Sequence, residues 1–155
     1  MSGSTYLPQK GEGMNDVYVT IPLEPQPKLR PRFRVVRGRV FTHTPYETKE
    51  FENQVAALYI NKADGKMFER YKPLEVRISF FMEIPKSFSK KKRADIESGL
   101  LSHTVKPDLD NLTKSVLDAL NGIAWYDDAQ IVELKVNKYY SAGSGRITLY
   151  ISEMG

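Results

Sequence analysis

Four stretches of the chain alternate apolar and other residues, and this pattern limits the folds that the chain can adopt. The clearest stretch is 76–84, where every second residue is apolar, as in a strand with one buried face. Similar alternation predicts a first strand at about 16–23 and two later strands around 132–136 and 147–151. The "SAGSG" between the last two indicates a hairpin loop. The chain is therefore built around at least one sheet.

Three other stretches have features typical of helices. "TPYE" at 44–47 combines a capping threonine, a proline suited to the first helical position and a capping-box glutamate, and predicts a helix over about 45–61. "SKKKRADIESG" at 89–99 predicts a short helix capped by its first serine and ended by its glycine. The third predicted helix starts near Asp110, a candidate N-cap, and ends at Asn121–Gly122.

The length and the order of these elements define the expected fold class. A chain of 155 residues with 41% hydrophobic residues has the size of one domain with one core. We expect an α+β fold, a single domain in which helices pack on a mixed β-sheet. Residues 1–13, "MSGSTYLPQKGEG", are polar and glycine-rich. We expect them to be a disordered leader or a cloning remnant, and we assign 14–155 to the folded domain.

Several classes of protein are disfavoured by what the sequence lacks. The chain contains no cysteine, which excludes disulfides and thiolate metal sites. It has no apolar run long enough to span a membrane and no recognisable signal peptide. We therefore expect a cytoplasmic protein with no membrane partner.

Positive charge is concentrated in two segments. The net charge of +4 is a weak sign of a polyanionic partner, but residues 28–39 hold six basic residues and no acid, and residues 86–93 hold five basic residues in eight. The first segment has the pattern of a basic strand or hairpin with Gly38 near its turn. Candidate contacts to DNA phosphates are Lys28, Arg30, Arg32, Arg34, Arg37, Arg39, Lys90, Lys91, Lys92 and Arg93. The alternatives are a solvated edge strand and an exposed charged helix.

Negative charge is concentrated in a region that follows both basic segments in the sequence. "KPDLDNLTKSVLDALNG" places Asp108 and Asp110 one residue apart where a helix begins, and in an extended segment their side chains would point the same way. The alternative is that Asp110 only caps the helix, that Asp108 is solvated and that Lys114 forms a surface ion pair. A second pair, Asp127 and Asp128, precedes a predicted strand, where the alternative is a turn.

Convergent carboxylates with no histidine or cysteine nearby suit a hard cation, Mg²⁺ or Mn²⁺ as its substitute. A bound ion of this kind activates water and stabilises charge on a scissile phosphate. Lys114 lies one turn beyond Asp110 and is placed to orient a carboxylate or to neutralise developing charge. The pattern therefore indicates metal-assisted phosphodiester hydrolysis.

The acidic segment extends into a longer motif. "KPDLDNLTKSVLDALNGIAWYDDAQIVEL" and the terminal "ITLYISEMG" closely resemble the RusA family of Holliday junction resolvases, which is common in bacteriophages and prophages. Upstream, "PKLRPRFR", "TPYETKEFE" and "IPKSFSKKKR" resemble the family's early basic segment, first helix and middle basic helix. The resemblance covers the chain from about Val17 to its end. It implies a Mg²⁺-dependent homodimer that resolves four-way DNA junctions by paired symmetric nicks in DNA recombination and repair.

The resemblance also implies roles for individual residues. The family's essential residues fall on Asp108, Asp110 and Asp128, which bind metal, and on Lys114, which is catalytic. Asp118 and Asp127 rank lower. Two rival functions stay open, a non-catalytic branched-DNA-binding protein that keeps the fold and a nuclease that acts on flap or single-stranded DNA. We expect no nucleotide cofactor in any of these cases.

Overall fold

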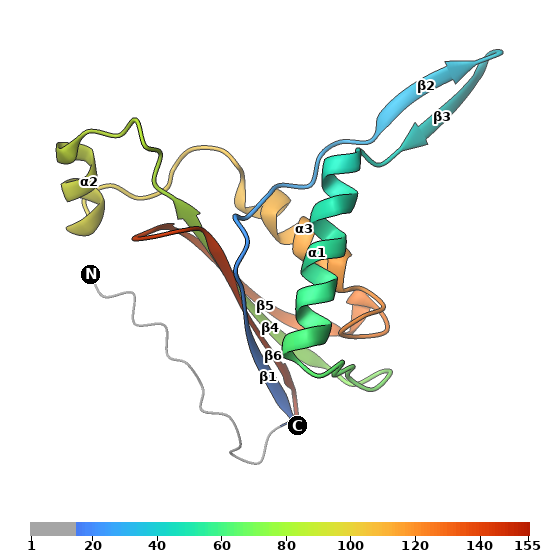
Figure 1. The fold of residues 1–155 in the computed structure, drawn as a ribbon. Helices are drawn as coiled ribbons and strands as arrows, with labels where there is room; N and C mark the ends of the chain where they lie inside the picture. Colours follow the sequence, from blue (N-terminus) through green and yellow to red (C-terminus); the bar gives the residue numbers. More distant parts are fainter. Residues whose placement is uncertain (1–14) are drawn as a thin grey trace.

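The computed structural model describes residues 15–155, so the expected leader at 1–13 lies outside the described part of the chain. The elements are β1 (Asp16–Ile21), β2 (Arg32–Val36), β3 (Arg39–His43), α1 (Tyr46–Lys62), β4 (Leu74–Glu83), α2 (Lys90–Glu97), α3 (Leu109–Leu120), the 3₁₀ turn η1 (Asp128–Gln130), β5 (Ile131–Ser141) and β6 (Arg146–Glu153). Figure 1 shows a sheet covered by α1 and α3, with α2 and the β2–β3 segment extending away from it.

The main sheet has four strands in the order β1-β6-β4-β5. β6 is antiparallel to both β1 and β4, whereas β5 is parallel to β4, so the sheet is mixed, as predicted. The predicted hairpin of β5 and β6 is wrong, because β4 lies between them and the loop 142–145 joins strands that are not neighbours. Alternation shows which face of a strand is buried, but it carries no information about the strand's neighbours.

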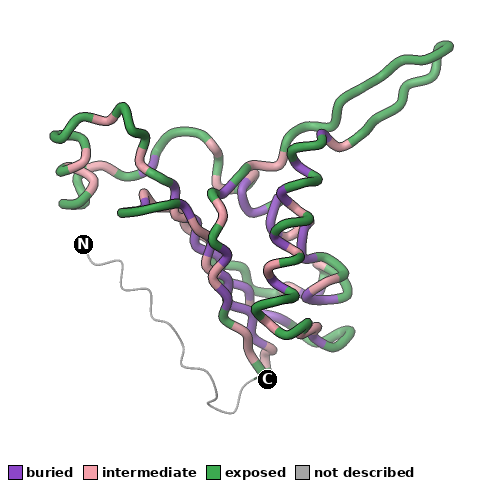
Figure 2. The backbone as a smooth tube through the Cα atoms, viewed as in Figure 1, coloured by how far each residue is buried: buried purple, intermediate pink, exposed green. Residues whose placement is uncertain are grey.

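The core lies between the sheet and the two covering helices. Its fully buried members, with at most 1% of their surface exposed, include Val76, Ile78, Phe80, Ile147, Leu149 and Ile151 from the sheet, and Val55, Tyr59, Leu112, Val116 and Leu120 from the helices. Each such side chain contributes roughly 1.5–3 kcal/mol by leaving water. Figure 2 shows this buried band along the strands and the inner sides of α1 and α3. The α+β fold with helices packed on a mixed sheet is therefore confirmed.

The start of α1 differs from the prediction by one residue. Pro45 is the N-cap, with φ −54° and ψ 145°, and no side chain caps the helix. The capping box expected from Thr44 and Glu47 is therefore wrong. Because Pro45 adopts an extended conformation instead of the first helical position, Thr44 lies one residue too early to cap.

Two basic elements protrude from the body. β2 and β3 form the predicted hairpin, with Arg37 and Gly38 at positive φ (50° and 75°) in its turn, the geometry that two-residue hairpin loops require. All its strand residues are exposed. Helix α2 has no buried residue, and its predicted cap is confirmed, since the Lys92 N–H donates to Ser89 Oγ at 3.2 Å.

Among residues 15–155, no helix is long and apolar enough to cross a membrane.

Candidate active site at the start of helix α3

The first turn of α3 presents two carboxylates. Asp108 is the N-cap, in an extended conformation with φ −69° and ψ 145°, and its carbonyl accepts the Leu112 N–H at 3.0 Å. Its carboxylate makes no capping hydrogen bond, and Asp110 follows in the first turn, so the expectation that Asp110 is the N-cap is wrong. Both residues are exposed. Within residues 15–155 neither carboxylate has an ion pair, although the helix dipole favours negative charge here.

The loop before α3 is held against the sheet. Lys138 on β5 donates from Nζ to the carbonyls of Val105 and Pro107, at 2.8 and 2.9 Å. These two hydrogen bonds fix the backbone immediately before Asp108. The Lys28 N–H donates to the Asn111 carbonyl at 3.1 Å, so the segment before the hairpin is attached to the same helix turn.

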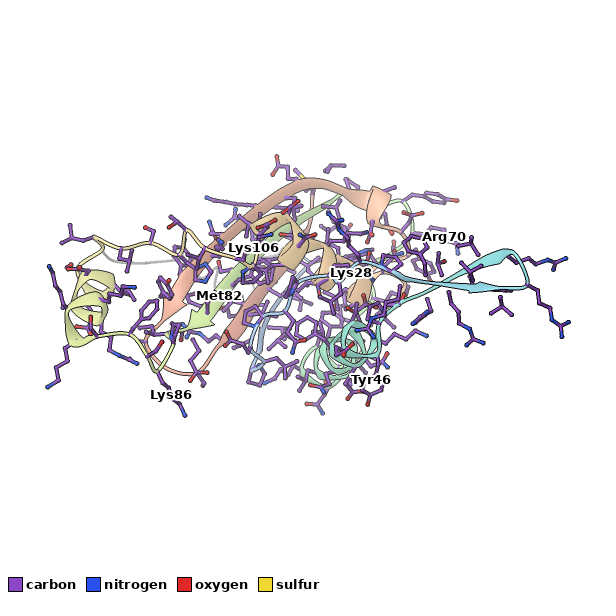
Figure 3. All side chains as sticks on the ribbon, turned by 90° about the horizontal axis from the view of Figure 1, so that it is seen from above. Lys28, Tyr46, Arg70, Met82, Lys86 and Lys106 are labelled. Carbon is purple, nitrogen blue, oxygen red and sulfur yellow. The ribbon has the colours of Figure 1, made fainter. Side chains whose placement is uncertain are left out.

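An open groove of about 600 Å³ lies beside Asp108. Its lining includes three basic residues, Lys28, Arg30 and Lys106, together with Asn111 and the acidic Glu24. Figure 3 shows Lys28 and Lys106 in the middle of the molecule, between α2 and the hairpin. The sequence prediction did not include Lys106 or Asn111. Lys106 directly precedes Pro107 and Asp108 of the motif. This position beside the candidate ligands is the sequence feature that could have identified it as a site residue.

Asp128 lies in a different setting, at the first residue of η1. Its Oδ1 accepts a hydrogen bond from Trp125 Nε1 at 2.7 Å, and Trp125 is fully buried. Burial raises the pKa of the Asp128 carboxyl, and the charges of Asp118 and Asp127 add to this, whereas the Trp125 hydrogen bond and Lys114 oppose it. Asp128 therefore lies where a cation would relieve electrostatic repulsion.

The raised pKa of Asp128 predicts a stability change on substitution. Because the folded pKa is above the unfolded pKa, the charged carboxylate destabilises the fold at pH 7, and this cost disappears as pH falls through the folded pKa. Asp128→Asn removes the charge and keeps an oxygen for Trp125. We expect the variant to unfold at a higher temperature than the wild type at pH 7, with the difference vanishing towards about pH 4. Thermal unfolding followed by circular dichroism measures this.

Asp64→Asn is the matched control for this measurement, because Asp64 is exposed in the turn after α1. It should leave the unfolding temperature unchanged at both pH values. An Asp128→Asn protein that is less stable than the wild type at pH 7 would show that the carboxylate supports the fold, and the electrostatic account would be wrong.

Lys114 belongs to an ion-pair network along the exposed face of α3. Its Nζ lies 3.4 Å from Asp118 Oδ2, one turn further along the helix, and its side chain is 62% exposed. Asp118 also pairs with Lys28 at 3.1 Å, and Lys28 pairs with Glu52 at 2.6 Å. Lys28 is therefore already neutralised by acids of its own chain. Lys114, by contrast, is exposed enough to reach a phosphate with a small rotation.

Within residues 15–155, no group of three or more histidine, cysteine, aspartate or glutamate side chains is close enough together to hold a metal ion. Asp108 and Asp110 lie together at the start of α3, whereas Asp128 is near Lys114 and Asp118. The chemistry of the first pair still fits Mg²⁺, which binds through one or two carboxylates and completes its shell with water and phosphate oxygens. The convergence of all three aspartates stays a prediction.

The two predicted DNA-binding segments lie on opposite sides of this site. The hairpin with its arginines extends from one side of the body and α2 from the other, and the start of α3 lies between them (Figure 1). The arginines of the hairpin strands are exposed, and among residues 15–155 one ion pair involves them, between Arg32 and Glu47 at 4.0 Å. The basic charge therefore surrounds the acidic site on both sides, as a polyanion that crosses the site would require.

Comparisons with known proteins bear directly on this arrangement. The family model described as Endodeoxyribonuclease RusA matches residues 22–152. The chain belongs to the RusA family. A relative from Enterobacteria phage 82, named Crossover junction endodeoxyribonuclease rusA, is 31% identical over 92% of this chain and 98% of its own length. The Escherichia coli K12 protein of the same name has the same identity and coverage.

A further relative comes from a different bacterium. The Uncharacterized protein YqaN of Bacillus subtilis is 36% identical over 91% of this chain and 99% of its own length. The RusA family resemblance inferred from the sequence is therefore confirmed, and the match covers nearly the whole described domain.

Proposed function

We propose that this RusA family chain is a Mg²⁺-dependent, structure-selective endodeoxyribonuclease that resolves Holliday junctions by paired symmetric nicks in DNA recombination and repair. The observation that carries the proposal is the pair of exposed carboxylates at the start of α3, Asp108 and Asp110. Within residues 15–155 neither forms an ion pair, and Asp108 lines a groove that also contains Lys28, Arg30 and Lys106. Two relatives carry the name crossover junction endodeoxyribonuclease. The place of action is the cytoplasm of a bacterial or phage-infected cell, where such DNA is present.

Asp108 and Asp110 are the residues that we propose to hold Mg²⁺, or Mn²⁺ in its place. Both are exposed, and Asp108 lines the groove, so water and a phosphate oxygen have access to this end of the helix. When bound, the ion would lower the pKa of a water ligand and stabilise charge on the scissile phosphate. We retain Asp128 as the third proposed ligand on the basis of the family motif, although within residues 15–155 the three aspartates do not form a group that could hold a metal ion.

The chain's own groups complete the proposed chemistry. The Lys114 side chain rotates away from Asp118 towards the scissile phosphate. Its ammonium group then stabilises the negative charge that develops on the phosphate during cleavage. The hydrogen bonds from Lys138 hold the backbone before Asp108, so this carboxylate is positioned before DNA arrives. Lys106 and Arg30 in the groove are placed to bind the neighbouring phosphates.

The proposed DNA contacts come from both protruding elements. In the hairpin they are Arg30, Arg32, Arg34, Arg37 and Arg39, with Lys28 at its base, and in α2 they are Lys90, Lys91, Lys92 and Arg93. A four-way junction presents arms on both sides of its branch point, and the site lies between the two basic elements. We also propose a homodimer, because two equal sites related by a two-fold axis would place two symmetric nicks.

A cleavage assay tests the proposed substrate. The wild-type protein is incubated with Mg²⁺ and with end-labelled four-way junction, flap, single-stranded and linear duplex DNA of the same sequence. We expect nicks in two opposite strands of the junction at symmetric positions and little cutting of linear duplex. Preferential cutting of the flap or the single strand would favour the rival nuclease. Tight junction binding without cutting would favour a non-catalytic binder.

The basic segments predict a steep salt dependence of junction binding. Contacts to about six phosphates would lower the affinity by about a thousandfold between 50 and 200 mM salt. Removing one arginine of the hairpin, in Arg34→Gln, should reduce the slope of log affinity against log salt by about one. Lys62→Gln is the control, because Lys62 is exposed at the end of α1, away from the hairpin tip. A salt-independent affinity would remove the basic segments from the interface.

A further inference from the structure

The outer edge of β5 is an open strand edge. β5 (Ile131–Ser141) is the last strand of the sheet, and among residues 15–155 it pairs only with β4. Within residues 15–155, no backbone N–H or C=O of 132–140 makes a hydrogen bond outside that pairing. A long edge of this kind is a template for another strand, and monomeric proteins usually block it with a proline or a bulge. β5 contains no proline, and its one irregularity lies at its start, where Val132 is an extra residue between the Ile131–Leu74 and Glu133–Glu75 pairs. From Glu133 to Ser141 the pairing is regular.

Apolar residues are exposed along this edge. Val132 is 59% exposed and Leu134 is 45% exposed. Leu134 pairs in register with Val76 of the core, and Val136 pairs with Ile78, so these β5 side chains lie on the face that α1 and α3 cover. The helices therefore leave the outer margin of this face uncovered.

Two charges flank Leu134 symmetrically and lack partners. Glu133 and Lys135 lie on the opposite face of the strand, and within residues 15–155 neither forms an ion pair. Their neighbours on β4 carry the same sign, since Glu133 pairs in register with Glu75 and Lys135 with Arg77. Glu75 and Arg77 already pair with each other. The described part of the chain, residues 15–155, therefore offers no group that neutralises either charge.

We propose that β5 pairs with β5 of a second copy, antiparallel and with Leu134 opposite the partner's Leu134. In this register Glu133 lies opposite the partner's Lys135, and Lys135 lies opposite the partner's Glu133, so both charges gain a partner of opposite sign. Val132 lies opposite the partner's Val136, and a continuous apolar strip forms across the two-fold axis. Directly opposed pairs of both kinds stabilise a sheet.

Charge selects this register over its neighbours. A two-fold axis perpendicular to a sheet passes between two copies of the same residue. Moving the axis to Glu133 or to Lys135 would place like charges opposite each other, which destabilises the pairing. With the axis at Val132, Glu133 would lie opposite the partner's Ile131. With the axis at Val136, Lys135 would lie opposite the partner's Asn137. In both cases a charged residue would lie opposite an uncharged one. The register centred on Leu134 therefore pairs all four charges.

This inference rests on the homodimer of the proposed function and names its surface. The axis is perpendicular to the sheet, so α3 of each copy lies on the same side of the joined sheet. Both copies of Asp108 would then face one DNA junction, as two nicks in a single substrate require. The interface itself can be tested without DNA, so its failure and the failure of the nuclease proposal give different results.

Cysteine cross-linking tests the register, because the chain has no cysteine of its own. In Leu134→Cys the two thiols face each other across the axis, with Cβ atoms about 4.5–5.5 Å apart, close to the separation that a disulfide needs. In Val132→Cys the two thiols are four residues apart along the strands, about 13 Å. We expect mild oxidation to convert most of Leu134→Cys to a covalent dimer and little of Val132→Cys.

Val132→Cys is a strict control, because position 132 is the more exposed of the two and would react more readily in random collisions. Equal cross-linking of the two variants, or none in Leu134→Cys, would overturn the proposed register.

Charge reversal at positions 133 and 135 tests the interface independently, because a second reversal should restore the dimer that the first one disrupts. Light scattering should give the wild type a mass near twice 17.7 kDa. Lys135→Glu places Glu133 opposite a second acid and should shift the mass towards that of a monomer, whereas the double variant Glu133→Lys/Lys135→Glu restores opposite pairs and should return the dimer. Lys49→Glu, an exposed reversal on α1, should have no effect. A monomeric wild type, or a dimer that Lys135→Glu leaves intact, would refute the interface.

Discussion

Asp108→Asn is expected to abolish DNA cutting, by about a thousandfold or more, while junction binding stays intact or becomes tighter. Asparagine keeps the size of the side chain and its ability to occupy an N-cap, so α3 should begin at the same residue. The loss of one negative charge weakens cation binding and reduces repulsion of the DNA backbone. Cleavage of a labelled junction and a gel-shift titration of the same DNA measure the two effects separately.

The control for this variant is Asp64→Asn, which removes an exposed carboxylate outside the groove and should leave both cutting and binding unchanged. Circular dichroism of Asp108→Asn should match the wild type, because its carboxylate makes no capping hydrogen bond in the structure. An unfolded Asp108→Asn protein would mean that the residue has a structural role, and unimpaired cutting would exclude it from the site.

Lys114→Ala is expected to slow cutting by about a hundredfold and to change junction affinity by much less. The ammonium is 62% exposed and pairs with Asp118 at 3.4 Å, and exposed pairs at this spacing contribute only about 0.3–0.5 kcal/mol to stability. The fold should therefore be unaffected. Single-turnover cleavage with the protein in excess isolates the chemical step from binding.

Lys62→Ala is the matched control, an exposed lysine on the other covering helix, and it should leave the cleavage rate unchanged. If Lys114→Ala lost affinity and cleavage rate by the same factor, the residue would belong to the DNA-binding surface and its proposed charge stabilisation would be wrong.

The fold was largely predictable because its strands have simple patterns. The structure confirms the strands predicted from alternation in 76–84 and in the last two stretches. In β4 the alternating apolar residues are buried, whereas in β5 Val132 and Leu134 are exposed. The order of the strands was not predictable, because the pairing of β6 with β4 and β1 depends on contacts between distant segments. Sequence proximity favoured a β5–β6 hairpin, and the structure instead inserts β4 between them.

The candidate site was predictable in part. The motif located Asp108 and Asp110 at the start of a helix, and the spacing of four residues placed Lys114 and Asp118 on one exposed face, which their ion pair confirms. The pairing of Lys28 with Asp118 and Glu52 was not foreseen, because these groups meet only in the folded chain. For the same reason the groove itself could not be predicted from the sequence, although the position of Lys106 beside the motif pointed to that residue.

Mn²⁺ titration followed by electron paramagnetic resonance tests most directly whether Asp108 and Asp110 bind a divalent cation. The wild type and Asp64→Asn are expected to remove free Mn²⁺ from solution to the same extent. The double variant Asp108→Asn/Asp110→Asn is expected to lose this binding while it remains folded. A double variant that binds as much Mn²⁺ as the wild type, or a wild type that binds none, would contradict the account.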